Sequence, residues 1–188
     1  MNVYDFDGTV RRGDTSADFY FFELRRHPAI ALDLPRVGWS FLRYKLGRIA
    51  LRDFKQVFFA FLRRVPDLEA DLALFREKNR DCLDAWYLAQ ARPDDVIITA
   101  SPEWLVAPLI PGATVIGTRV DQKTGAFDGE NCKGEEKVAR LRLALGDGAL
   151  TEIEKFYSDS RSDTPLALLA REACLVGKDC TLSPWNQA

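Results

Sequence analysis

The chain has 188 residues, a formal net charge of −2 and a hydrophobic content of 47%. This composition supports one folded domain with a sizeable core, and it excludes both a disordered chain and a strongly basic nucleic-acid-binding protein. The single histidine, His27, excludes a cluster of histidine metal ligands, a phosphatase mechanism with two imidazoles, and a zinc finger.

The first predicted elements are a short strand and a long helical segment. Residues 1–6 predict a strand that ends in an Asp-Gly turn. Residues 15–65 have the apolar spacing of helices, with breaks at Pro28 and Pro35. A longer helix is predicted over residues 67–91.

After residue 93 the pattern changes to strands that alternate with helices. Strands are predicted over residues 95–100, 114–120, 155–157 and, as the last strand, 173–176, and helices over residues 133–145 and 164–171. This alternation is typical of an α/β fold with a parallel sheet and helices on both faces. The core domain is predicted to comprise residues 1–13 and 92–188, and residues 14–91 are predicted to be an inserted helical cap.

The predicted cap is basic and aromatic. Residues 11–65 contain twelve basic and five acidic residues, although the whole chain is slightly acidic. This imbalance indicates either an anionic partner or a solvated helix face. We assign its aromatic side chains to the core of the cap, with contact to lipid as the alternative: Tyr20, Phe21, Phe22, Trp39, Phe41 and Tyr44.

Cysteine spacing and hydropathy predict a cytoplasmic location. The four cysteines lack C-x-x-C spacing, which favours reduced thiols. The first ten residues contain two aspartates and do not resemble a signal peptide. Because no run of about 18 apolar residues is present, no membrane-spanning helix is expected.

Two pairs of aspartates follow predicted strands. Asp5 and Asp7, in the sequence DFDGT, share one face of an extended chain, and Asp159 and Asp163 follow the strand at 155–157. Because ligands bind at the carboxyl ends of parallel strands, the four carboxylates are predicted to converge on one hard cation, and oxygen ligands favour Mg²⁺. Of Asp5 and Asp7, one is suited to act as a nucleophile and the other to move a proton. The structural alternatives are an Asp-rich turn and a helix cap at Asp163.

A phosphate site is predicted beside these carboxylates. Ser101 and Pro102 lie where a strand gives way to a helix, and a hydroxyl with free helix N–H groups binds anions well. Ser101 is expected to cap that helix. Gly8 and Thr9, in the turn after Asp7, are assigned to the same site.

Four motifs in this order resemble the haloacid dehalogenase superfamily: DFDGT at residues 5–9, TAS at 99–101, NCKGEEKV at 131–138 and SDSRSD at 158–163. The resemblance implies a Rossmann-like core, and the insertion is similar to the cap of the phosphoserine phosphatase-like branch. The sequences SPEWLV at 101–106 and YSDS at 157–160 resemble a bacterial subgroup of that branch. The subgroup includes the phosphatase of phosphatidylglycerophosphate. Ser158 replaces the glycine that is usual in phosphoserine phosphatases.

The resemblance implies a role for each residue. Asp5 would be the nucleophile that forms an aspartyl-phosphate, and Asp7 would protonate the leaving alcohol and then activate water. Asp5, Asp159 and the backbone carbonyl of Asp7 would hold Mg²⁺, and Asp163 would orient a lysine or a metal-bound water. Ser101 would bind the phosphoryl oxygens. Because haloacid dehalogenases lack the second aspartate, Asp7 favours a phosphatase.

The lysine and the substrate contact stay open. The spacing in phosphoserine phosphatases selects Lys133, whereas the spacing in the closer subgroup selects Lys137, which we favour. Both lysines are alternatively solvated surface residues. Asp14 stands where relatives place a polar substrate contact, or it caps the helix that starts near Thr15.

We therefore predict a Mg²⁺-dependent phosphatase that hydrolyses a small phosphate monoester and has no nucleic-acid partner. The alternatives are a peripheral lipid-phosphate phosphatase whose cap lies on a membrane surface, a phosphotransferase, and a non-catalytic binding module. The oligomeric state is not predicted.

Overall fold

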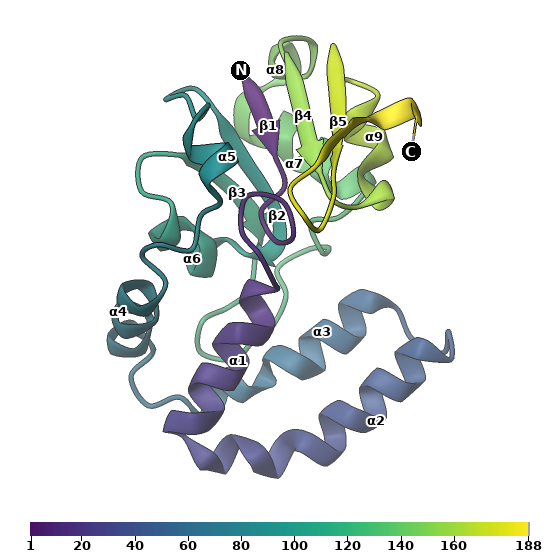
Figure 1. Ribbon diagram of the computed structural model, residues 1–188. Coiled ribbons are helices and arrows are strands. Elements are labelled where there is room, and N and C mark those ends of the chain that lie inside the picture. Colours follow the sequence, from purple (N-terminus) through teal and green to yellow (C-terminus); the bar gives the residue numbers. More distant parts are fainter. Residues whose placement is uncertain (188) are drawn as a thin grey trace.

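The computed structural model describes residues 1–187 and consists of an α/β layer joined to a layer of helices (Figure 1). Its sheet has the strand order β3-β2-β1-β4-β5-β6. The strands are β1 (Asn2–Tyr4), β2 (Val96–Pro102), β3 (Thr114–Thr118), β4 (Lys155–Ser158), β5 (Glu172–Val176) and β6 (Leu182–Pro184). Neighbouring strands from β3 to β5 pair in parallel, and β6 pairs antiparallel with β5. The predicted α/β fold with a mainly parallel sheet is confirmed.

The helices fall into two groups. Between β1 and β2 lie α1 (Thr15–Arg26), α2 (Leu34–Lys45), α3 (Leu51–Phe59), α4 (Leu68–Lys78) and α5 (Ala85–Leu88), with 3₁₀ turns at Pro28–Asp33 and Ala60–Arg64. After β2 lie α6 (Glu103–Val106), α7 (Glu135–Leu145), α8 (Asp147–Thr151) and α9 (Thr164–Ala167). We call α1 to α4 the helical insertion.

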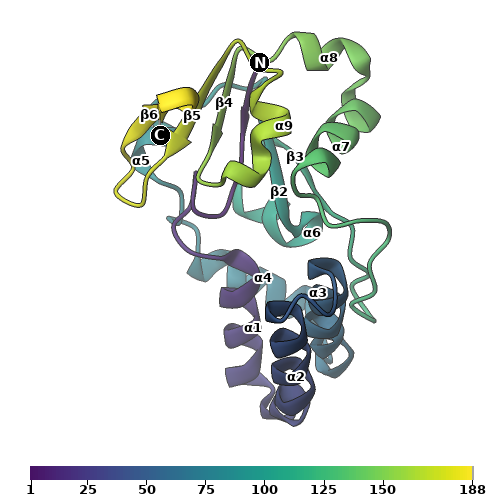
Figure 2. The same cartoon turned by 90° about the vertical axis from the view of Figure 1, so that its right-hand side faces the viewer.

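Alternating side chains give each face of the sheet its own core. Val3 and Phe156 pack with Leu141 on the face that α7 and α9 cover (Figure 2). Tyr4 and Tyr157 occupy the opposite face, where their ring centroids are 4.8 Å apart in a stacked pair. The short strands are therefore buried on both sides, as expected for a parallel sheet.

The helical insertion has an aromatic core that continues into the α/β layer. Phe19 of α1 packs edge-on against Phe75 of α4, with centroids 5.1 Å apart, and against Trp104 of α6 at 6.0 Å. These rings belong to the same buried cluster as Tyr4 and Ile97 of the sheet. The insertion is thus anchored by packing, and the carboxyl ends of β1, β2 and β4 point toward it (Figure 1).

The prediction of one continuous helix over residues 67–91 is wrong, because the helix is interrupted in the middle of this segment. α4 begins after Asp67, which accepts a hydrogen bond from the Ala70 N–H, but it ends at Lys78. Beyond α4, Leu83 forms an isolated antiparallel β-bridge with Arg11, and the Asp84 N–H donates to the Val10 carbonyl. Pairing with the loop after β1 therefore overrides the helical spacing of this segment.

Two expectations for the C-terminal third are also wrong. The strand that ends at Val176 is not the last one, because a turn leads into the antiparallel edge strand β6. The helix predicted over residues 164–171 stops at Ala167. Both segments are short, so the spacing of their apolar residues does not define where a helix or strand ends.

Some aromatic side chains of the insertion are not in its core. Tyr20 is buried and Phe22 half-buried, but Phe21, Trp39 and Phe41 are 52%, 61% and 43% exposed. The prediction that these three side chains lie in the core is therefore wrong. Trp39 and Phe41 instead form an apolar surface on α2. Among residues 1–187, no helix combines the length and apolar character needed to cross a membrane.

Candidate active site

A buried carboxylate–lysine–carboxylate group lies at the carboxyl ends of β1 and β4. Asp5 directly follows β1, and its N–H donates to the Tyr157 carbonyl of β4. Nζ of Lys137, from the first turns of α7, lies 2.7 Å from Oδ1 of Asp5 and 2.7 Å from Oδ2 of Asp163. Lys137 is 1% exposed, so one cation is shared by two carboxylates away from water.

Asp163 holds the lysine in place. Its Oδ2 also accepts a hydrogen bond of 2.9 Å from the Ser158 hydroxyl, and its Oδ1 accepts one of 3.3 Å from the Gly134 N–H. Burial lowers the pKa of Lys137, but Asp5 and Asp163 outweigh burial and raise it overall. Lys137 therefore stays charged, and its position is fixed from two sides.

Burial controls the protonation of Asp5. It raises the pKa of Asp5 to about 7, against the opposing charge of Lys137, and the Asp163 carboxylate adds to the rise. A cation bound beside Asp5 would favour its ionised form and so lower its pKa. The site is therefore electrostatically suited to a bound metal ion.

Lys133, the other candidate lysine, lies on the surface. Its backbone N–H donates to the Asn131 carbonyl, and the charge of its side chain helps to lower the pKa of Asp159 against the larger effect of burial. Lys133 precedes the N-cap of α7, four residues before Lys137, and faces solvent.

The Asp7 carboxylate faces the start of α1. Oδ1 of Asp7 accepts hydrogen bonds from the Thr15 N–H, at 2.8 Å, and from the Thr15 hydroxyl, and Oδ2 accepts one of 2.5 Å from the Ser101 hydroxyl. Burial is the largest effect on its pKa and raises it despite these donors. A raised pKa suits a carboxyl group that must carry a proton near neutral pH.

Ser101 and Pro102 end β2 at an irregular register. The Ser101 hydroxyl lies 2.9 Å from the hydroxyl of Ser16, so both serines gather beside Asp7. Pro102 is buried, pairs with Thr118 and has no N–H group to offer an anion. The helix cap predicted at Ser101 is wrong, because Pro102 occupies the N-cap position of α6.

Asp14 occupies the N-cap of α1. Its side chain accepts a hydrogen bond of 2.9 Å from the Ala17 N–H. Its charge adds to the effect of burial that raises the pKa of Asp7. Capping accounts for Asp14, and a substrate contact stays a prediction.

Gly8, Thr9 and Asp159 form a tight junction between the loops after β1 and β4. The Thr9 hydroxyl accepts a hydrogen bond of 3.0 Å from the Asp159 N–H. Gly8 has a φ of +75°, and a Cβ at this position would collide with Oδ2 of Asp159. The Asp159 carboxylate thus lies against the backbone that follows Asp7.

The donor set of this junction fits a hard cation. The charge of Asp159 adds to the effect of burial that raises the pKa of Asp5, and the close approach of Asp159 to Gly8 brings it to the Asp7–Gly8 peptide. Two carboxylates and a carbonyl are oxygen donors that Mg²⁺ prefers. Among the four predicted ligands, the Asp7 side chain is directed to Thr15 and Ser101, and Asp163 is directed to Lys137.

We expect Gly8→Ala to inactivate the site. A positive φ strains an alanine by roughly 1–2 kcal/mol, and the added Cβ would displace the Asp159 carboxylate. The variant should unfold at a lower urea concentration and bind Mg²⁺ at least tenfold more weakly, as measured by calorimetry. Gly38→Ala, where a Cβ meets open space in α2, is the control. Unchanged Mg²⁺ binding by Gly8→Ala would contradict this account.

Lys55 of α3 reaches the same region and was not identified from the sequence. Its Nζ donates to the Ala100 carbonyl at 2.8 Å and to Oδ1 of Asn131 at 2.9 Å. Burial lowers its pKa to about 8, although Asp14 and Asp7 act in the opposite direction. The sequence pattern that could have identified Lys55 is its position within the apolar face of α3, where a lysine is unexpected.

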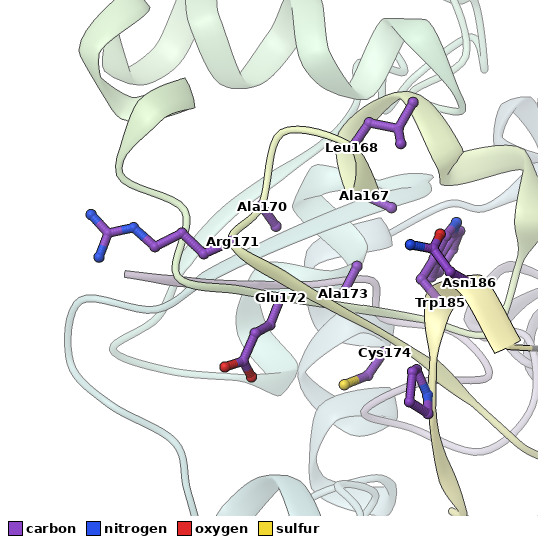
Figure 3. A pocket seen from close by; sticks show the side chains of 10 residues that line it. Ala167, Leu168, Ala170, Arg171, Glu172, Ala173, Cys174, Trp185 and Asn186 are labelled. Atoms are coloured by element: carbon purple, nitrogen blue, oxygen red, sulfur yellow. The ribbon is translucent and has the colours of Figure 1, made fainter.

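A cavity of about 580 Å³ lies away from these residues, between α9 and the strands β5 and β6 (Figure 3). Small and apolar side chains such as Ala167, Ala173 and Trp185 provide much of its lining. The carboxylate–lysine group does not line this cavity. The candidate site is therefore defined by its ionisable groups at the strand ends.

Comparisons with known proteins show which family the sequence matches. The sequence profile described as haloacid dehalogenase-like hydrolase matches residues 3–168. Protein CicA from two strains of Caulobacter vibrioides is 31% identical over 193 residues, which cover 90% of this chain and 82% of CicA.

Two crystal structures share the fold. A protein of unknown function from Bordetella pertussis Tohama I has a TM-score of 0.70 at 21% identity, over 92% of this chain and 87% of its own. A phosphoserine phosphohydrolase-like protein from Francisella tularensis has a TM-score of 0.53 at 18% identity, over 92% and 86%. With a profile match that spans most of its length, the chain belongs to the haloacid dehalogenase-like hydrolase family.

Proposed function

We propose that this protein is a Mg²⁺-dependent phosphatase that hydrolyses a small phosphate monoester through an aspartyl-phosphate on Asp5. The observation that carries the proposal is the buried bridge of Lys137 between Asp5 and Asp163, with Asp7 two residues beyond Asp5. A phosphoserine phosphohydrolase-like protein among the structural neighbours supports the same reaction class. We further propose that residues 14–91 act as a cap over a core of residues 1–13 and 92–188.

In the first step a carboxylate oxygen of Asp5 attacks phosphorus. The bond between phosphorus and the ester oxygen breaks, and Asp7 gives its proton to the leaving alkoxide. Lys137 neutralises negative charge beside the transferred group, because its Nζ already contacts Asp5. The products of this step are an alcohol and the acyl phosphate of Asp5.

In the second step Asp7, now ionised, takes a proton from water. The water oxygen attacks the phosphorus of the acyl phosphate, and the bond to the Asp5 oxygen breaks to release inorganic phosphate. The hydrogen bonds from Thr15 and Ser101 hold the Asp7 carboxyl in position for both proton transfers. Asp7 thereby regains its proton for the next cycle.

Asp5, Asp159 and the carbonyl of Asp7 are proposed to hold Mg²⁺. When bound, the ion supplies positive charge that orients the phosphoryl oxygens and offsets the charge developing on them. We place the enzyme in the cytoplasm, consistent with four cysteines that are all free among residues 1–187.

Hydrolysis of p-nitrophenyl phosphate tests the proposal. We expect turnover that requires Mg²⁺ and stops on addition of EDTA. Beryllium fluoride should form an adduct at Asp5, detectable by ¹⁹F NMR, because it mimics an aspartyl-phosphate. An inactive protein that also forms no adduct in Mg²⁺ would overturn the proposal and favour a non-catalytic binding module.

Lys55 is expected to attract the substrate phosphate. In the wild type, kcat/KM should fall as the pH rises through about 8, because Lys55 then loses its proton and its charge. Lys55→Met should lower kcat/KM about tenfold at pH 7, which corresponds to a free-energy loss of roughly 1.4 kcal/mol. The variant should also lack this alkaline decline. Lys45→Met, at an exposed lysine of α2, is the control. An alkaline decline that persists unchanged in Lys55→Met would exclude the role of Lys55.

One observation favours lipid phosphate as a second candidate substrate. Trp39, Leu42 and Leu46 are 61%, 47% and 58% exposed, and Arg43 is exposed among them. Apolar and basic side chains on α2 and its C-cap suit the surface of an anionic membrane. Sedimentation with phosphatidylglycerol vesicles should then depend on Trp39, whereas the absence of sedimentation would exclude this alternative.

A further inference from the structure

A second cluster of ionisable side chains lies in the helical insertion, between α1 and α4. Glu23 and His27 are four residues apart and share a face, and Asp71 of α4 meets them. Nε2 of His27 lies 2.7 Å from Oδ2 of Asp71 and 3.5 Å from Oε2 of Glu23. One donor atom from each residue lies within 4.8 Å of the others, and residues 1–187 contain no other such group of three.

Glu23 has no hydrogen-bond partner in this cluster. Its side chain is fully buried, and within the described residues neither carboxylate oxygen has a hydrogen-bond partner. An unpaired buried polar group costs free energy that a native fold rarely leaves uncompensated. Burial, followed by the Asp71 charge, raises the pKa of Glu23 to about 8. The missing partner is therefore a cation or a proton.

The surroundings leave room for a cation. Nε of Arg26 lies 2.8 Å from Oδ1 of Asp71, which fixes that carboxylate and leaves Oδ2 to the cluster. Two carboxylates face one fixed cation, Arg26, so negative charge remains when the imidazole is neutral and Glu23 is ionised. The His27 side chain is 22% exposed, which opens one edge of the cluster to solvent. Water can supply a fourth ligand from that edge.

We propose that Glu23, His27 and Asp71 bind one borderline divalent cation, such as Zn²⁺, that ties α1 to α4. Zinc bonds to nitrogen and oxygen are about 2.0–2.2 Å, which places tetrahedral ligands roughly 3.3 Å apart. The spacings of 2.7 and 3.5 Å at His27 Nε2 are close to this value. One imidazole with two carboxylates suits Zn²⁺, whereas Mg²⁺ prefers oxygen donors alone.

Because His27 is the one histidine of the chain, its imidazole gives a single and assignable NMR signal. Protein labelled with ¹³C and ¹⁵N in histidine is titrated with Zn²⁺ in the presence of excess Mg²⁺, which occupies the site at Asp5 and Asp159. We expect the ring signal to move to a new position that saturates at one equivalent of Zn²⁺. Mg²⁺ alone should leave it in place. This readout does not depend on the proposed phosphatase activity.

Glu23→Gln separates coordination from chance binding by an imidazole. The amide fills the same volume but is a poor ligand, so half-saturation should require at least tenfold more Zn²⁺. Glu77→Gln, at an exposed position of α4, should titrate as the wild type does. An unmoved His27 signal in the wild type at twofold excess Zn²⁺ would overturn the proposal, even if Glu23→Gln failed to fold. Equal titration of the wild type and Glu23→Gln would also overturn it.

Discussion

Asp5→Asn is expected to abolish phosphate-ester hydrolysis, with a fall in kcat/KM of about 10⁴-fold or more. The amide cannot form the acyl phosphate, and an asparagine removes one proposed oxygen ligand of Mg²⁺. The fold should survive, because Lys137 keeps its ion pair with Asp163 and the side-chain volume is conserved. Steady-state kinetics with p-nitrophenyl phosphate measure the loss, and urea unfolding checks the fold.

Asp81→Asn serves as the control for this substitution. Asp81 is exposed, and its hydrogen bond joins only the neighbouring Arg80 at the surface. Its removal should leave kcat/KM within about twofold of the wild type. If Asp5→Asn retained a tenth of wild-type activity, Asp5 would not be the nucleophile, and the aspartyl-phosphate route would be abandoned.

The sequence was most informative where side chains follow strands. Asp5 and Asp163 were selected because the loops after parallel strands meet at one edge of a sheet, and the structure brings both to Lys137. Spacing left Lys133 and Lys137 unresolved, because the patterns of the two related groups of phosphatases select different lysines. Lys137 is 1% exposed and Lys133 lies on the surface, and this difference in burial arises only when α7 packs on the sheet.

Other features depend on packing between distant segments. Lys55 lies 45 residues before Ala100, whose carbonyl it contacts, and no local pattern connects them. His27 was an isolated histidine in the sequence, and only the pairing of α1 with α4 brings Asp71 to it. The break after α4 has the same cause, since residues 83 and 84 pair with the loop after β1.

Lys137→Met is expected to destabilise the protein by about 3–5 kcal/mol near neutral pH, the usual effect of removing one partner of a buried ion pair. Asp5 and Asp163 would then be two buried carboxylates without a cation. Urea unfolding in EDTA measures the effect without any compensating metal ion. Hydrolysis should be lost as well, because the transferred phosphoryl group loses its neutralising charge.

The pH dependence of this loss identifies its cause. Burial already raises the pKa of Asp5 to about 7, and removal of Lys137 raises it further. A folded state whose carboxyl pKa lies above the unfolded value binds more protons than the unfolded state, so stability falls as the pH rises between the two values. The deficit of Lys137→Met should therefore be small at pH 5 and large at pH 8.

Lys133→Met is the matched control, since it removes an exposed lysine just before α7 and should change stability by less than about 0.5 kcal/mol. Adding Asp163→Asn to Lys137→Met should recover part of the stability at pH 8, because one unpaired buried charge is removed, but it should recover no activity. A deficit that is equal at pH 5 and pH 8 would point to lost packing of the lysine stem. The two carboxylates would then have no part in holding Lys137.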